Sequence, residues 1–378
     1  MTDRALPGWK DKTLFTPGPL TTSRTVKQAM LRDLGARDGG FLQVVAENRR
    51  MLLEAAGLSP EEYDVIFLQG SGTYGVEAIL GTAVPRGGRV LVVNNGAYGA
   101  RMARICDVAG IDNAVLRYPE NHPARATDIE MALEDDPGIT HVAVVHLETT
   151  SGLVNPIDEI GAVVARHKKQ YFVDAMCSFG AVPVDFARAR IDWLVSSANK
   201  CLEGVPGFTF VIARLDSLRA GRGNARSLSL DLYDQWEYFG RVGQFRFTPP
   251  VQSLLAFHQA MLELEAEGGV AGRADRYRNN HATLLAGMRA MGFAEYVPVE
   301  DQGYIITTFM YPDDPNFDFD VFYDRLSRRG YDIYSGKVAE GSCFRIGNIG
   351  RIFQEDMEDL LAAIRDTLRA MDVRALTL

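Results

Sequence analysis

Two segments of similar design lie near the middle of the chain: Tyr171-Phe-Val-Asp-Ala-Met176 and Trp193-Leu-Val-Ser-Ser-Ala-Asn-Lys200. Each begins with a short apolar run that is typical of a buried strand and continues with polar residues. Strands that are apolar on both faces belong in a sheet with helices on both sides. The two segments therefore predict an α/β fold with a mostly parallel central sheet.

The same alternation of apolar runs and helical periodicity extends to both sides of these segments. It predicts strands at 65–68, 90–93, 141–145, 171–173, 193–195 and 208–213, and helices at 73–83, 98–109, 128–134 and 157–167. This order of elements is typical of successive βαβ units.

The pattern changes after Thr248-Pro-Pro250. The remainder predicts long helices at 251–267 and 273–291, strands at 304–309 and 343–346, and further helices at 319–329 and 354–371. We therefore expect an N-terminal segment (1–20), a large domain (21–260) and a smaller C-terminal α+β domain (261–378).

Composition narrows the class of protein. The 378 residues carry a net charge of -9, which argues against a nucleic-acid partner. The 47% of hydrophobic residues can build a large core. Neither a secretory leader nor a run of about 18 apolar residues is visible, so a cytoplasmic protein without a membrane partner is expected. The four cysteines are far apart, which predicts neither disulfides nor a metal site.

Polar residues follow five of the predicted strands. They are Gln69-Gly-Ser-Gly-Thr-Tyr-Gly75, Asn94-Asn-Gly-Ala-Tyr-Gly99, His146-Leu-Glu-Thr-Thr-Ser-Gly152, Asp174 and Ser196-Ser-Ala-Asn-Lys200. Ligands of open parallel sheets bind beyond the carboxyl ends of the strands. We therefore expect these residues to meet at one ligand site.

Taken singly, these residues allow more than one interpretation. Ser71 and Thr73 open a predicted helix, where they could hold a phosphate or serve as ordinary N-cap residues. Their spacing matches neither the Walker loop nor the dinucleotide motif. Asp174 and Lys200 could form a structural ion pair or hold a ligand between them.

One ligand, pyridoxal 5′-phosphate, suits all five strand ends. Its aldehyde needs a lysine, its ring nitrogen a carboxylate, and its phosphate a helix N-terminus. Lys200, Asp174 and the Ser71–Thr73 segment offer these groups. Thr149 could bind the ring hydroxyl. Tyr98 could stack on the ring, although it could also be a core aromatic.

Three motifs resemble class V aminotransferases: residues 95–102, 174–180 and 196–208. Three others, 16–24, 226–236 and 343–350, resemble the branch of that family that moves the amino group of 2-aminoethylphosphonate to pyruvate. The resemblance extends from about Leu14 to Met371. It implies pyridoxal-phosphate fold type I and a homodimer whose active site draws on both subunits.

The resemblance also assigns roles to particular residues. Lys200 and Asp174 would be catalytic. The cofactor phosphate would contact Ser71, Gly72, Thr73 and Asn199, together with Thr248 from the neighbouring subunit. Arg345 would bind the anionic group of the substrate, because the planar fork of a guanidinium suits both a phosphonate and a carboxylate. Leu147 and the segment 35–40 depart from the usual family pattern.

Three other functions stay open on the sequence alone. Alanine or serine transamination with glyoxylate would use the same scaffold. A cysteine desulfurase is less expected, because Cys343 lies in a strand-like run. A non-enzymatic α/β protein would leave Asp174 and Lys200 neutralising each other.

Overall fold

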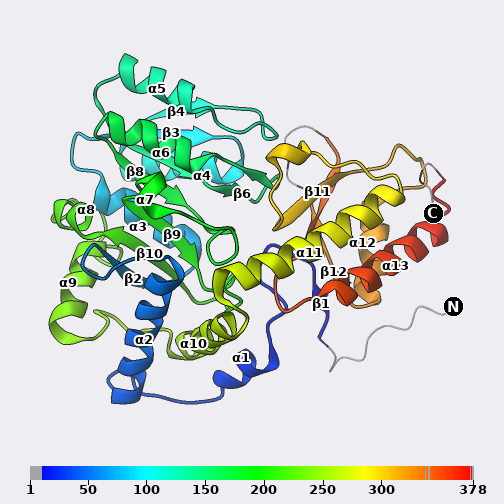
Figure 1. The fold of residues 1–378 in the computed structure, drawn as a ribbon, viewed down its shortest axis with the longest axis horizontal. Helices are drawn as coiled ribbons and strands as arrows, with labels where there is room; N and C mark the ends of the chain where they lie inside the picture. Colours follow the sequence, from blue (N-terminus) through cyan, green and yellow to red (C-terminus); the bar gives the residue numbers. More distant parts are fainter. Residues whose placement is uncertain (1–10, 337, 339–340, 375, 377–378) are drawn as a thin grey trace.

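The computed structural model describes residues 11–336, 338, 341–374 and 376, and the first ten residues of the predicted N-terminal segment, including Trp9, lie outside them. The described residues form a central seven-stranded sheet (Figure 1). Its order is β2 (Tyr63–Gln69), β10 (Phe208–Arg214), β9 (Trp193–Ser197), β8 (Gln170–Asp174), β5 (Ile139–Val145), β3 (Arg89–Asn94) and β4 (Asp112–Arg117). β10 runs antiparallel to both of its neighbours, and the other paired strands are parallel. The predicted mostly parallel sheet is confirmed.

Both faces of the sheet are covered, as the apolar strands require. Alternate residues of β2 show this, because Val65 and Phe67 contact one buried cluster while Ile66 and Leu68 contact another. The first cluster includes α2 (Gly39–Ala55), α5 (Ala126–Asp135), α6 (Ile157–Arg166), α7 (Phe186–Ala189) and α10 (Val251–Ala266). The second includes α3 (Gly72–Ala83), α4 (Ala97–Ala109) and α8 (Leu215–Ala220), and α9 (Leu232–Val242) contributes to both.

A smaller α+β unit follows, with its own apolar core built around Phe309, Phe344 and Leu360. Its antiparallel sheet has the order β11 (Ile306–Met310), β14 (Cys343–Gly347) and β13 (Tyr334–Ser335). Its helices are α11 (Gly269–Ala290), α12 (Phe319–Arg328) and α13 (Gln354–Ala370). Figure 1 shows α11 extending from the large unit into the small one.

The first described stretch of the chain, residues 11–29, joins these two units. Its strand β1 (Thr13–Leu14) pairs in parallel with β12 (Tyr331–Asp332) of the small unit, and α1 (Arg24–Ala29) contacts α10. The short elements β6 (Leu147–Glu148), β7 (Leu153–Val154) and η1 (Val299–Asp301) complete the described fold. The boundary at residues 260 and 261 stays a prediction.

Several elements of the large unit escaped the sequence analysis, among them α9, β4 and α2. β4 lies at the edge of the sheet, where its residues are only half-buried, so it lacks a continuous apolar run. α2 begins with two glycines and contains several charged residues, which dilute its apolar periodicity.

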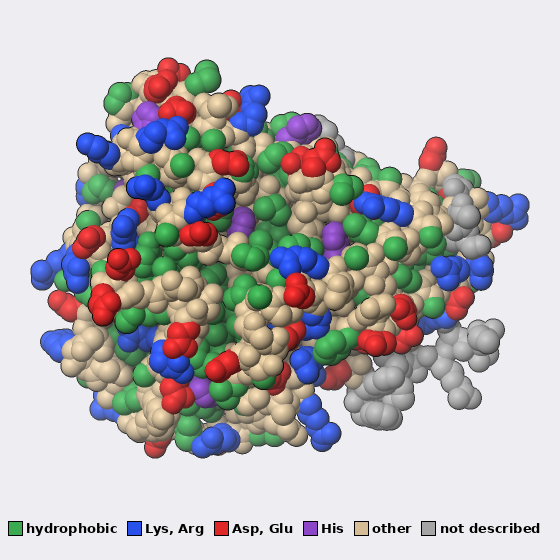
Figure 2. Space-filling view, viewed as in Figure 1, with side chains coloured by type: hydrophobic (Ala, Val, Ile, Leu, Met, Phe, Trp, Pro, Cys, Tyr) green, Lys and Arg blue, Asp and Glu red, His purple; other side chains and the backbone are tan. Residues whose placement is uncertain are grey.

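Charged side chains of both signs are spread over the face of the molecule that Figure 2 shows. No helix in the described part of the chain has the length and apolar character needed to cross a membrane.

Candidate active site

A cavity of about 190 Å³ lies at the carboxyl edge of the large sheet. It is lined by Ser71, Gly72, Thr73, Val76, Tyr98, Arg101, Asp174, Met176, Ser197, Asn199 and Lys200. All the predicted site residues except Thr149, Thr248 and Arg345 are therefore brought together. They meet because the strands that precede them are parallel to one another.

Asp174 is the last residue of β8 and is only 4% exposed. Its Oδ1 accepts a hydrogen bond from the Met176 N–H at 2.9 Å. Burial raises the pKa of this carboxyl to about 7, and the negative charge of Glu148 adds to the effect, while Arg101 and Lys200 oppose it. A cationic partner entering the cavity would therefore favour ionisation of Asp174.

Lys200 lies in the loop between β9 and β10. Its Nζ donates to the carbonyl oxygen of Pro17 at 2.7 Å, and no ion pair joins it to Asp174 among the described residues. The N-terminal segment passes close above the amine, because a Cβ on Gly18 would lie 2.8 Å from Nζ. The alternative of a direct Asp174–Lys200 ion pair is therefore not what the structure shows.

The turn after Lys200 is held by buried charges. Glu203 has φ +59°, and its carboxylate pairs with Arg276 at 2.7 Å and accepts a hydrogen bond from the Tyr277 hydroxyl. The fully buried Arg273 donates to the Cys201 carbonyl at 2.7 Å and pairs with Glu267 at 2.6 Å. Sequence reasoning missed this cluster, because its members are far apart in the chain.

The N-terminus of α3 offers unused hydrogen-bonding groups. Ser71 occupies the N-cap position, yet its side chain makes no capping hydrogen bond. The buried Ser197 Oγ has no hydrogen-bond partner among the described residues. A Cβ on Gly72 would lie 2.3 Å from the end of the Met176 side chain, so a larger residue there would require that side chain to move. Free hydroxyls and N–H groups at a helix N-terminus fit a phosphate.

Ser197 was missed as a site residue, although it lies within the quoted segment 196–200. Its neighbour Ser196 donates to the carbonyl of Ala175 at 3.2 Å. The alternation of side chains along β9 could have separated the two serines.

Tyr98 lies in the first turn of α4 and is half-buried. Burial raises the pKa of its hydroxyl to about 12. The buried carboxylate of Glu148 accepts from the Tyr98 N–H at 3.3 Å and from the Thr150 hydroxyl at 2.6 Å, and so it fixes the start of α4. Glu148 was also missed, although it lies within the quoted segment 146–152 that follows a predicted strand.

Arg345 and Thr149 lie outside the cavity lining but touch each other. Arg345 Nη1 donates to the Thr149 carbonyl at 3.0 Å, and its Nε donates to the Ser335 carbonyl at 3.1 Å. Arg345 is 4% exposed, and within the described residues it forms no ion pair. Burial lowers its pKa, and the guanidinium is held by neutral carbonyls. The Thr149 hydroxyl donates to Cys177 Sγ at 2.8 Å.

Thr248 lies between α9 and α10, is exposed and does not line the cavity. Its expected role in a neighbouring subunit stays a prediction.

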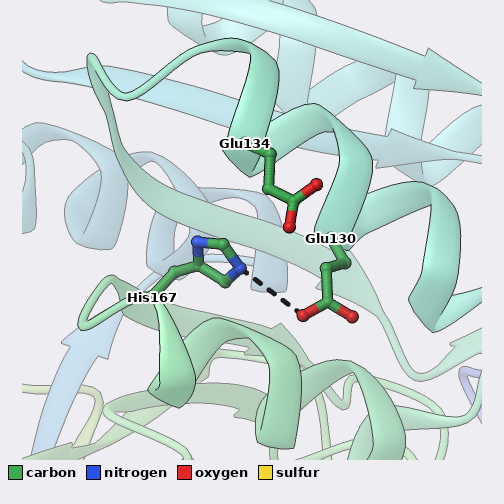
Figure 3. A group of neighbouring side chains, drawn as sticks. All are labelled: Glu130, Glu134 and His167. Carbon is green, nitrogen blue, oxygen red and sulfur yellow. Dashed lines mark ion pairs between the residues drawn. The ribbon is translucent and has the colours of Figure 1, made fainter.

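Glu130, Glu134 and His167 form a cluster of potential metal ligands away from this cavity (Figure 3). His167 Nε2 lies 3.7 Å from Glu130 Oε1, and Arg166 already pairs with the same carboxylate at 2.9 Å. The arginine supplies the positive charge that an ion would otherwise bring. This cluster is a partly exposed group at α5 and the end of α6, in which Arg166 pairs with Glu130.

The architecture is shared with solved aminotransferases. Pyridoxamine–pyruvate aminotransferase from Mesorhizobium loti is 25% identical, with a TM-score of 0.88 over 99% of this chain and 96% of that chain. Alanine–glyoxylate aminotransferase from Nostoc sp. is 24% identical, with a TM-score of 0.88 over 96% and 97% of the two chains. The predicted fold type I class, a mostly parallel large sheet with a smaller C-terminal unit, is confirmed.

Sequence comparison gives the family. Residues 31–336 match the family described as Aminotransferase class-V. A curated relative, 2-aminoethylphosphonate–pyruvate transaminase of Salmonella paratyphi C (strain RKS4594), is 50% identical over 356 residues, covering 94% of this chain and 97% of the relative. The relative of the same name from Salmonella typhimurium (strain LT2) has the same identity and coverage. The chain belongs to the class V aminotransferase family.

Proposed function

We propose that this enzyme transfers the amino group of 2-aminoethylphosphonate to pyruvate and releases phosphonoacetaldehyde and L-alanine. The observation that carries the choice of substrate is the 50% identity to the curated transaminases over 94% of the chain. The geometry supports it, because Arg345 places a buried guanidinium, bound only to neutral groups among the described residues, beside the loop that follows β5.

The cavity also fits pyridoxal 5′-phosphate, which we propose as the cofactor. When bound, it supplies an electron sink for the carbon that carries the amino group. Lys200 would bind its aldehyde and Asp174 its ring nitrogen, with Tyr98 against the ring face. Thr149 would bind the ring hydroxyl by giving up its hydrogen bond to Cys177 Sγ. The unpartnered Ser197 Oγ and the uncapped Ser71 support a phosphate site that also includes Gly72, Thr73 and Asn199.

Each proposed role follows from the chemistry of a side chain. When not bound to the aldehyde, the Lys200 Nζ would take a proton from the substrate carbon that bears nitrogen and would deliver a proton to the carbon of the cofactor aldehyde. Asp174 stays anionic when a cationic ring nitrogen lies beside it, because two opposite charges about 4 Å apart attract by about 4 kcal/mol at an effective dielectric of 20. Arg345 binds the phosphonate of one substrate and the carboxylate of the other. A ping-pong reaction follows from two substrates sharing one site.

We also propose a homodimer in which Thr248 reaches the cavity of the partner. Apolar side chains are exposed close to Thr248, with Leu228 79% and Phe247 52% exposed. Arg246 links them, because it donates to the Leu228 carbonyl at 2.8 Å and lies over the Phe247 ring at 5.1 Å. A second copy would cover this apolar surface. The cytoplasmic location stays a prediction.

An amine-donor screen tests the proposed reaction. Purified enzyme loaded with pyridoxal phosphate is supplied with pyruvate and either 2-aminoethylphosphonate or serine, and the alanine formed is measured. A parallel set replaces pyruvate with glyoxylate and uses alanine or serine as donor. We expect 2-aminoethylphosphonate with pyruvate to give the highest kcat/KM. A preference for serine or alanine with glyoxylate would instead support the rival reaction.

Borohydride trapping tests the cofactor independently of the donor. We expect reduction of the protein with pyridoxal phosphate to leave a covalent adduct at Lys200, detected by peptide mass spectrometry. A protein that bound the compound elsewhere, or not at all, would fit the non-enzymatic alternative.

A further inference from the structure

The expected phosphate site has a charge deficit. Ser71, Gly72, Thr73 and Asn199 are all neutral, whereas a phosphate monoester carries about 1.5 to 2 negative charges near pH 7. A helix N-terminus supplies only about half a positive charge. The acidic residues beside this site, Asp174 in the cavity lining and the buried Glu148, supply no positive charge either. A bound phosphate therefore calls for a cationic side chain.

Besides Lys200, the cavity lining formed by the described residues contains one other cationic side chain, that of Arg101. It lies on α4, and its Nη1 donates to Thr73 Oγ1 at 3.3 Å. Its guanidinium lies over the ring of Tyr98, 4.7 Å from the centroid. Thr73 belongs to the expected phosphate site and Tyr98 to the expected ring site, so Arg101 joins the two.

The charge of Arg101 is not neutralised by the part of the chain that the structure describes, since no carboxylate there forms an ion pair with it. Its positive charge reaches into the cavity, because it opposes the rise that burial causes in the pKa of both Asp174 and Tyr98. An exposed arginine paired with nothing would normally extend into water. Here its guanidinium is held between a threonine hydroxyl and an aromatic face.

We propose that Arg101 is a cofactor-binding residue whose guanidinium neutralises the phosphate group, with the Tyr98 ring as the surface that holds it in place. This inference rests on the proposed cofactor. It adds a charged contact to the neutral phosphate ligands that the sequence predicts. Guanidinium groups suit the task, because their parallel N–H donors match two phosphate oxygens.

The test compares two probes that differ only in the phosphate: pyridoxal 5′-phosphate and pyridoxal. Their dissociation constants are measured on the apoenzyme by absorption titration for the unmodified protein, Arg101→Gln, Arg101→Lys and Arg104→Gln. Arg104 is a matched control, because it is exposed on the same helix and does not line the cavity. Circular dichroism checks that each apoenzyme is folded.

We expect Arg101→Gln to weaken pyridoxal phosphate binding about 10- to 100-fold, the range for losing one hydrogen bond to a charged group. Pyridoxal binding should stay within about twofold, Arg101→Lys should recover part of the loss, and Arg104→Gln should change neither constant. An unchanged preference for the phosphorylated probe in Arg101→Gln would overturn the inference. So would equal weakening of both probes, which would assign Arg101 to the ring of Tyr98 or to a neighbouring subunit.

Failure of this inference can be told apart from failure of the proposed function. If the unmodified protein forms the borohydride adduct at Lys200 and makes alanine, but Arg101→Gln keeps its affinity, only the role of Arg101 is wrong. If the unmodified protein binds neither probe at Lys200, the proposed cofactor itself is wrong.

Discussion

Asp174 and Lys200 line one cavity, yet the Lys200 amine donates to the Pro17 carbonyl at 2.7 Å, and no Asp174–Lys200 ion pair is present in the described structure. A direct contact between them would close the space that a ring needs. Because the amine is satisfied by a main-chain oxygen, the acid and the base stay separate before the cofactor binds. The fold thus keeps the carboxyl of Asp174 and the amine of Lys200 apart at a ligand site.

Replacing Lys200 by alanine should remove the visible absorption that pyridoxal phosphate gains when a lysine binds it, and also the transamination. Lys169→Ala is a matched control, because Lys169 also donates to a proline carbonyl, that of Pro137 at 2.9 Å, but lies outside the cavity. Spectra and turnover are recorded on both purified variants. Full turnover by Lys200→Ala would refute the assignment.

Asp174 should make the cofactor-free protein less stable at high pH. Burial raises its pKa from 3.8 to about 7, so the folded state keeps a proton that the unfolded chain releases. This contribution to the free energy of unfolding is complete below pH 3.8 and is lost as the pH rises through 7.

The Asp174→Asn apoenzyme cannot ionise at this position. At pH 8 it should therefore be more stable than the unmodified apoenzyme by on the order of 2–4 kcal/mol, with the difference shrinking toward pH 4. Urea unfolding over this pH range measures the effect. A difference that did not vary with pH would show that Asp174 ionises normally.

Arg345→Ala should raise KM for both substrates and lower kcat/KM by about 100-fold or more, as when one partner of a desolvated charge pair is removed. Arg345→Lys should recover little, because an ammonium cannot reproduce two parallel donors. Exposed Arg351, six residues further along, provides the control Arg351→Ala. Steady-state kinetics that matched the unmodified enzyme would exclude Arg345 from the site.

Arg273→Leu should cost about 3–5 kcal/mol of unfolding free energy, because it leaves buried Glu203 and Glu267 without one of their cations. Arg278→Leu, on the same helix with a 47% exposed side chain, should cost about 0.5 kcal/mol or less. Chemical denaturation compares the two variants. Equal losses would mean that the buried cluster contributes no special stability.

Phe247→Glu should separate the proposed homodimer into monomers, because it places a charge on the apolar surface next to Thr248. Val299→Glu changes another exposed apolar residue, 60% exposed in the small unit, and should leave the dimer intact. Sedimentation velocity measures both. A monomeric unmodified protein, or a Phe247→Glu variant that stays dimeric, would contradict the proposed interface.

Sequence patterns predicted the parallel strands and their ends well, because a buried strand needs a continuous apolar run and the ligand edge follows from strand direction. This is why Tyr98, Asp174 and Lys200 could be assigned to one site. The direction of β10 was not predictable, since an apolar run reads the same in a parallel or an antiparallel strand.

Other site residues carried no local signal. Arg101 looks like any exposed helical arginine, and only the fold reveals its contact with Thr73. Glu203 and Arg276 lie on separate elements, so neither residue indicates its partner. Long-range pairing of charges depends on tertiary structure, which periodicity does not encode.

The reversed direction of β10 limits how far Lys200, the proposed catalytic lysine, can move. Its loop leaves one strand and returns along the adjacent one, and the Ala198 N–H donates to the Phe208 carbonyl at 3.4 Å while the Gly204 N–H donates to the Ala198 carbonyl at 2.8 Å. With the main chain anchored at both ends, the reach of the amine during turnover is set by rotation about the bonds of its own four-carbon stem.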